Sequence, residues 1–165
     1  AASDVYKRQF IHRGYYDHME ESHELLAFYG NEKIWDILAE NPRNRVVVFG
    51  EQPEMLRFPC STQSYTDIEG SGGNFNLSSS PEVMADFFTF AGVDYIYLGS
   101  GYLKPGTDGF RNVTGLLKQG YLSDLLYENG NGLAVFSSEP TELTEEESEA
   151  LLAEFTEKYW PGEQQ

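Results

Sequence analysis

The chain has few cysteine and few basic residues. Cys60 is its single cysteine, so no disulfide can form within the chain. One cysteine does not indicate whether the protein works in an oxidising or a reducing compartment. Its 11 Lys and Arg stand against 27 Asp and Glu, which gives a formal net charge of −16. Because nucleic acids and anionic lipid surfaces are bound through clusters of Lys and Arg, we do not expect nucleic acid among the partners.

Histidine is scarce and confined to one end. His12, His18 and His23 are the three histidines of the chain, and none of the residues after them is His. A Ser-His-Asp or Cys-His arrangement would need its base from outside the main domain, and the Gly-x-Ser-x-Gly motif is absent. His18 and His23 are five residues apart, whereas helical zinc ligands are four apart. We therefore assign no catalytic residue, no metal and no cofactor to this chain.

Long apolar runs are also missing. No stretch of about 18 apolar residues and no secretion signal occurs, so the chain as given is expected neither to cross a membrane nor to direct its own export. Aromatic residues nevertheless make up 15% of the sequence, which is typical of a folded domain. A chain of 165 residues is long enough for one domain that buries about two thirds of its unfolded surface.

The pattern divides the chain into four segments. Residues 1–9 fit nothing that follows and are interpreted as a non-native or disordered leader. Residues 10–30 carry apolar side chains at helical spacing and are interpreted as an N-terminal linker helix. Residues 31–160 form a single predicted α/β domain, and residues 161–165 a tail.

The clearest local pattern is a helix followed by a strand between residues 79 and 98. Ser79 and Glu82 have the spacing of a capping box, and Pro81 suits a first helical turn. Gly92 is placed to end the helix, and residues 93–98 are a β-branched and aromatic run typical of a strand.

Similar signals predict the other elements. Helical spacing indicates helices over 34–38, over 113–117 and after a second capping box formed by Thr144 and Glu147. Residues 45–50 are a short Val-rich run that indicates a strand covered on both faces, and a further strand is expected within 60–65. Asn129-Gly130 is the strongest hairpin signal, between strands over 121–127 and 132–136.

This order predicts a three-layer α/β/α sandwich. Its sheet is expected to be mixed and mainly parallel, with strands 46–49 and 95–98 parallel to each other and a C-terminal antiparallel hairpin at one side. One shared core is expected. It is predicted to contain Val47, Phe49, Phe87, Phe88, Tyr95, Ile96, Leu116, Leu126 and Phe155.

Any small-molecule site is expected at the carboxyl edge of the parallel strands, where open α/β sheets bind ligands. The loop 99–109 and the irregular segment 51–73 should meet there. Tyr65 and Tyr102 are candidates for stacking on a sugar ring, while Asp67 and Asp108 are candidates for accepting hydrogen bonds from its hydroxyl groups. Turn-capping roles for the two Asp and packed positions for the two Tyr explain the same residues.

Several sequence segments resemble those of a known kind of domain. They are Ile34-Trp35-Asp36-Ile37-Leu38 leading to Asn44-Arg45-Val46-Val47-Val48, Phe90-Ala91-Gly92-Val93-Asp94-Tyr95-Ile96-Tyr97, and Gly120-Tyr121-Leu122 leading to Val135. Together they resemble the soluble C-terminal domains that follow the transmembrane helices of bacterial multi-pass glycosyltransferases that use polyprenyl-phosphate sugars, the GT-C kind. The resemblance covers residues 29–137.

The resemblance implies an extracytoplasmic domain at the cell membrane, part of a longer chain. In such proteins the catalytic carboxylates lie in loops of the membrane part, so the resemblance transfers no catalytic residue here. It implies as partners the transmembrane part of the parent chain and a carbohydrate or polyprenyl-linked sugar. The alternative is a freestanding soluble α/β enzyme or carbohydrate-binding module with its site at the same sheet edge.

Overall fold

The computed structural model describes residues 32–50, 58–65, 68 and 78–160. The predicted leader 1–9, the linker helix 10–30 and the tail 161–165 lie outside the described residues. Within the described part the elements follow one another in this order. They are α2 (Glu32–Ala39), β1 (Arg45–Phe49), β2 (Ser61–Ser64), α4 (Pro81–Ala91), β3 (Tyr95–Leu98), α5 (Asp108–Lys118), β4 (Leu122–Glu128), β5 (Asn131–Phe136) and α6 (Glu145–Tyr159).

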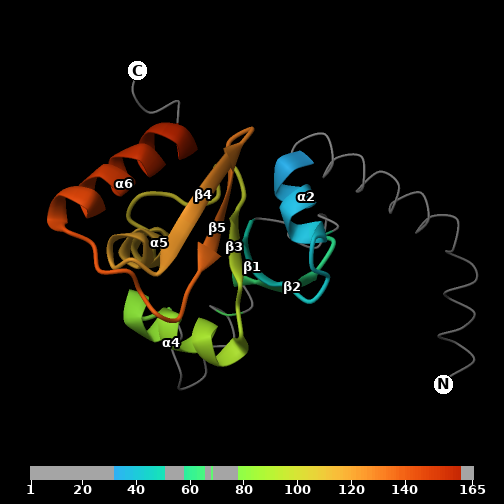
Figure 1. Cartoon of the computed structure of the whole chain (residues 1–165). Coiled ribbons are helices and arrows are strands. Elements are labelled where there is room, and N and C mark those ends of the chain that lie inside the picture. The colour runs from blue at the N-terminus through green and yellow to red at the C-terminus, as the bar shows by residue number, and fades with distance from the viewer. Residues whose placement is uncertain (1–31, 51–57, 66–67, 69–77, 161–165) are drawn as a thin grey trace, which may run out of the picture.

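The five described strands form one mixed sheet in the order β2-β1-β3-β5-β4 (Figure 1). Strand β1 pairs in parallel with both β2 and β3. Strand β5 lies antiparallel to β3 and to β4. The five predicted strands are present with ends that differ by one or two residues, and the parallel pairing of β1 with β3 and the hairpin at one side are confirmed.

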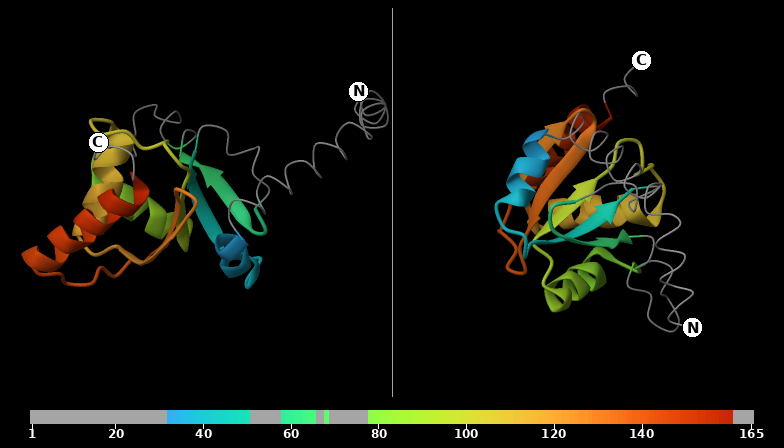
Figure 2. Two further views of the ribbon diagram at one scale, coloured as in Figure 1. Left: turned by 90° about the horizontal axis from the view of Figure 1, so that it is seen from above. Right: turned by 90° about the vertical axis from the view of Figure 1, so that its right-hand side faces the viewer.

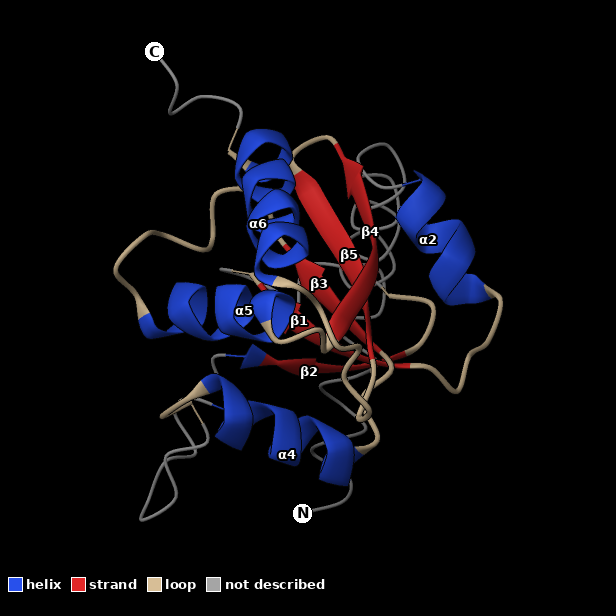
Figure 3. Ribbon diagram, turned by 60° about the vertical axis from the view of Figure 1, so that its left-hand side comes forward, coloured by secondary structure: helices blue, strands red, loops and turns tan. Residues whose placement is uncertain are grey.

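Helices cover both faces of the sheet, as the α/β fold requires (Figures 2 and 3). Helices α4, α5 and α6 pack on one face, where their apolar side chains join those of β1, β3 and β5 in a first core cluster. Helix α2 packs on the other face and builds a second cluster with Ile34 and Leu38. Its N-terminus is held by Glu128 of β4, whose carboxylate accepts hydrogen bonds from the Lys33 and Ile34 backbone N–H groups at 3.0 and 3.1 Å.

Strand β1 shows why two clusters form. Val47 and Phe49 point into the first cluster, while Val46 and Val48 point into the second, because successive side chains of a strand face opposite ways. All four are at most 1% exposed.

The prediction of one shared core needs a correction, because the sheet separates two. Six of the nine predicted core residues are fully buried in the first cluster, and Phe87 is half-buried against it. Tyr95 and Leu126 instead pack, half-buried, against the second cluster. Leu126 changes sides because β4 has a register irregularity between Ser123 and Leu126, where Asp124 adopts φ 48°.

The ends of α4 follow local chemistry. Pro81 opens the helix, and Gly92 closes it at φ 66°, a left-handed conformation that suits glycine. The N-cap is Ser80, whose hydroxyl oxygen accepts a hydrogen bond from the Val83 N–H at 3.2 Å. The predicted capping role of Ser79 is therefore wrong by one residue. The second predicted capping box, Thr144 with Glu147, is present in α6.

Replacing Phe88 by alanine is expected to lower the free energy of unfolding by about 3–5 kcal/mol, because it leaves a cavity in the first cluster. Phe90→Ala is a matched control on the same helix. The Phe90 side chain is 88% exposed, so its loss should change stability by less than about 0.5 kcal/mol. Urea unfolding of the full chain followed by circular dichroism measures both. Equal losses would contradict the placement of Phe88.

Candidate functional site

The carboxyl ends of β1 and β3 meet at one edge of the sheet. Phe49 pairs with Leu98 at these ends, and the Gly99 N–H donates to the Phe49 carbonyl at 2.7 Å. A Cβ atom on Gly99 would lie 3.1 Å from the same carbonyl oxygen and 3.5 Å from the Gly50 Cα. The carboxyl ends of β1 and β3 therefore lie together, as predicted, while most of the segment 51–73 that is expected to meet the loop 99–109 lies outside the described residues.

The structure places Tyr65 in the core instead of at this surface. Its side chain is 2% exposed, and its ring stacks on Phe49 with centroids 4.4 Å apart. It also touches the start of α5, where a Cβ on Gly109 would lie 3.2 Å from the Tyr65 ring. Tyr65 thus offers no ring face to a sugar, and the alternative of a packed tyrosine holds for this residue. Asp67 lies outside the described residues.

Tyr102 lies in the loop that follows β3, and Asp108 lies at the start of the helix after that loop. Tyr102 is half-buried against the first cluster, and its N–H donates to the Gly99 carbonyl at 3.2 Å. Asp108 is the first residue of α5 and pairs with Arg111 at 2.8 Å. Both charged side chains are about half exposed, at 51% and 52%, so solvent and ligands reach them.

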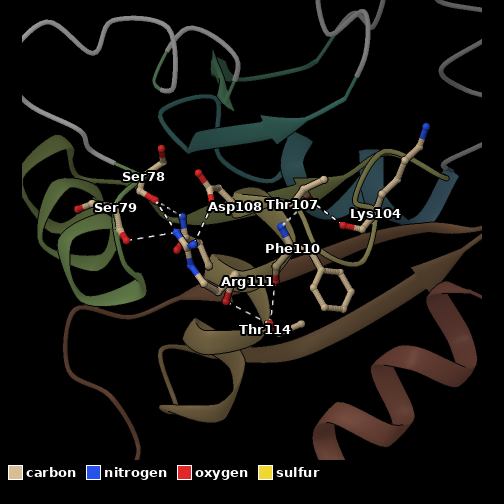
Figure 4. A network of polar contacts seen from close by, with 9 residues as sticks. Ser78, Ser79, Lys104, Thr107, Asp108, Phe110, Arg111 and Thr114 are labelled. Atoms are coloured by element: carbon tan, nitrogen blue, oxygen red, sulfur yellow. Dashed lines mark hydrogen bonds and ion pairs between the residues drawn. The ribbon is translucent and has the colours of Figure 1, made fainter.

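Arg111 is the centre of a polar network at this edge (Figure 4). One guanidinium nitrogen donates to Asp108, and another donates to the carbonyl oxygens of Ser78 and Ser79, each at 3.2 Å. The neighbouring Asn112, which is fully buried, donates to the Ser78 carbonyl at 2.7 Å. The first turns of α5 thereby hold the segment that leads into α4.

Sequence reasoning missed Arg111. The only local signal for it is the i,i+3 spacing from Asp108, which places opposite charges together on a helix. Its bonds to Ser78 and Ser79 join residues more than thirty positions apart, and no short motif marks such a contact.

The loop after β3 is fixed from two sides. The Tyr159 hydroxyl at the end of α6 donates to the Gly99 carbonyl oxygen, and burial raises the pKa of that phenol, so it stays protonated at neutral pH. On the hairpin side, the Ser100 N–H donates to the Asn131 side-chain oxygen at 2.8 Å. The loop also carries its own turn, in which the Thr107 hydroxyl donates to the Lys104 carbonyl at 2.7 Å.

Two cavities lie elsewhere on the described surface. One of about 310 Å³ opens at the amino ends of β1 and β2, next to the end of α4. The other, of about 250 Å³, lies between β4 and α6, with Leu122, Leu151, Asp124 and Glu154 among its lining residues. Neither includes the candidate residues at the carboxyl edge.

Cys60 is half-buried beside the second cluster. Burial first, and the charge of Asp94 second, raise the pKa of its thiol from 9.0 to about 11. The described residues contain no group of three or more His, Cys, Asp or Glu side chains placed to hold a metal ion. Among the described helices, none combines the length and the apolar composition needed to cross a bilayer.

Comparisons of the chain with protein-family models, with curated proteins and with solved structures gave no match.

Alkylation of Cys60 is expected to be slow and strongly pH-dependent. The thiolate is the reactive form, and a pKa of about 11 in place of 9.0 lowers its fraction at pH 8, by about 100-fold. The rate with iodoacetamide should therefore keep rising as the pH passes 10. The same chain in concentrated urea is the control, because unfolding restores the ordinary pKa. Equal rates for folded and unfolded protein at pH 8 would contradict the expected shift.

Proposed function

We propose that this chain is a non-catalytic, extracytoplasmic domain of a membrane glycosyltransferase-like protein. In this proposal it binds the hydroxyl groups of an acceptor or of a polyprenyl-linked sugar at the carboxyl edge of its sheet. The observation that carries the proposal is the exposed Asp108–Arg111 pair at that edge, in which Arg111 also donates to the Ser78 and Ser79 carbonyls.

The chemistry of the pair suits a sugar. The Asp108 carboxylate accepts hydrogen bonds from hydroxyl groups, and the Arg111 guanidinium donates them, so the two together can engage neighbouring hydroxyls of one ring. The two groups are 2.8 Å apart, and Arg111 is oriented by its bonds to the Ser78 and Ser79 carbonyls. A site held in this way loses little conformational freedom on binding.

The membrane setting rests on the resemblance, whose matching segments lie in neighbouring elements of the fold. The first segment runs through α2 into β1, the second from the last turn of α4 through Gly92 into β3, and the third from the start of β4 to β5. Tyr95 in the second segment pairs with Val135 in the third. The matching segments thus belong to strands that are neighbours in one sheet. They describe the frame of such a domain and assign no reaction to it.

A freestanding carbohydrate-binding module or soluble enzyme is the alternative, with its site at the same edge. The DNA upstream of the codon for Phe10 separates the two. Several segments of about 20 apolar residues in frame support a membrane glycosyltransferase-like parent. A start codon, or a signal peptide followed directly by this domain, contradicts the membrane setting.

Titration of the ¹⁵N-labelled full chain with methyl mannoside, N-acetylglucosamine and a short-chain polyprenyl phosphate tests the site. We expect amide shifts over 99–111 with Kd on the order of 1 mM for at least one sugar, which is typical of a small exposed site. Asp108→Asn should weaken that binding several-fold, because the amide nitrogen no longer accepts hydrogen bonds from hydroxyl groups.

Glu154→Gln is the matched control for this titration. Glu154 forms an ion pair of similar exposure with Lys158 on α6, at 2.6 Å, so its loss should leave the shifts over 99–111 unchanged. Shifts confined to α6, or no shifts with any of the three ligands, would contradict the proposed site.

A further inference from the structure

Helix α4 carries the two large hydrophobic residues that the described part of the chain exposes. Val83 is 38% exposed and Phe90 is 88% exposed. Large apolar side chains that are exposed together on one face of a protein mark interaction surfaces.

The two residues belong to one stripe, which we call the α4 stripe: Val83, Phe87 and Phe90. These positions are i, i+4 and i+7, so they lie above one another on the helix and span about 10 Å along its axis. Phe87 is half-buried where the stripe borders the first cluster. The inner side of α4 is already occupied, because Met84, Ala85 and Phe88 are buried in the core. Val83 and Phe90 therefore lie on the outer side of the helix, and Phe87 joins them to the packed side.

The charged residues of α4 itself have one sign. Glu82 and Asp86 are exposed on α4, and the helix contains no basic residue. Two exposed arginines contact the ends of the helix: Arg45 donates to the Ala91 carbonyl at 2.7 Å, and Arg111 donates to the Ser78 and Ser79 carbonyls. The first two turns of the stripe are thus acidic, and its last turn, at Phe90, is apolar.

This charge pattern selects among occupants. A second copy of the chain would bring Glu82 and Asp86 against acidic residues, between two molecules of charge −16 each. An anionic membrane surface would repel the chain for the same reason. A partner segment with apolar side chains bordered by Lys or Arg complements the stripe, because its apolar side chains can cover Phe90 and its cations can pair with Glu82 and Asp86.

We propose that the α4 stripe is a docking surface for a basic amphipathic helix of another protein segment. Its Lys or Arg side chains lie opposite Glu82 and Asp86, and its apolar side chains cover Phe90. This surface is separate from the carboxyl edge and does not depend on a sugar binding there.

The probe is a synthetic 15-residue amphipathic peptide with Leu on one helical face and Lys on the other. A second peptide keeps the Leu positions and replaces every Lys by Glu. With the ¹⁵N-labelled full chain we expect the Leu/Lys peptide to shift the amides of 82–91, and the Leu/Glu peptide to leave them unchanged. Phe90→Ser should weaken binding of the Leu/Lys peptide at least tenfold, while its exposure means that the circular dichroism spectrum stays the same.

A charge reversal separates specific docking from general attraction to an acidic protein. Asp86→Lys should weaken binding of the Leu/Lys peptide and allow the Leu/Glu peptide to bind. Glu149→Lys is the matched control, because Glu149 is an exposed acidic residue on α6, and it should leave the shifts over 82–91 unchanged.

Four results would overturn the proposal. Amide shifts confined to the first turn of α6 and insensitive to Phe90→Ser would indicate non-specific attraction. Failure of the Leu/Lys peptide to bind would show that the α4 stripe is not a docking surface. Self-association in sedimentation experiments that Phe90→Ser abolishes would make a second copy the occupant. Binding to phosphatidylcholine or phosphatidylglycerol vesicles that Phe90→Ser abolishes would make lipid the occupant.

Discussion

Strand β1 must be covered on both of its faces, and the rest of the structure follows from that constraint. Its side chains from Val46 to Phe49 are all buried, alternately on each side. A single layer of helices cannot cover such a strand. Helices α4, α5 and α6 supply one layer, and α2 supplies the other. Because α2 has only eight residues, aromatic side chains complete its layer: Trp35 stacks on Phe58 at 4.7 Å, and both meet the edge of Tyr97.

Features that depend on a few neighbouring residues could be predicted from the sequence. Asn129-Gly130 forms the hairpin turn because both residues accept positive φ, here 49° and 78°. Gly92 and the pair Thr144–Glu147 mark helix ends for similarly local reasons. The Val-rich run of β1 indicated burial on both faces, since no polar residue interrupts it. These signals are sufficient for the α/β frame and for the parallel direction of β1 and β3.

Features that depend on distant contacts could not be predicted. Tyr65 is buried by Phe49 and by the start of α5. Neither contact can be inferred from the residues next to Tyr65 in the sequence. The irregularity at Asp124 reverses the alternation of β4, so that Leu122 faces the first cluster and Leu126 the second. At the candidate site, Asp108 could be proposed from its place after a parallel strand, but Arg111 acquires its role through carbonyl groups of Ser78 and Ser79.

The hydrogen bond between Tyr159 and Gly99 has a consequence for the order in which contacts form while the chain is synthesised. Gly99 leaves the sheet at the candidate edge, and its partner lies 60 residues later at the end of α6. During synthesis the ribosome therefore releases the loop after β3 long before the tyrosine that fixes it. The loop after β3 therefore gains this contact only when α6, the last described helix, packs on the sheet.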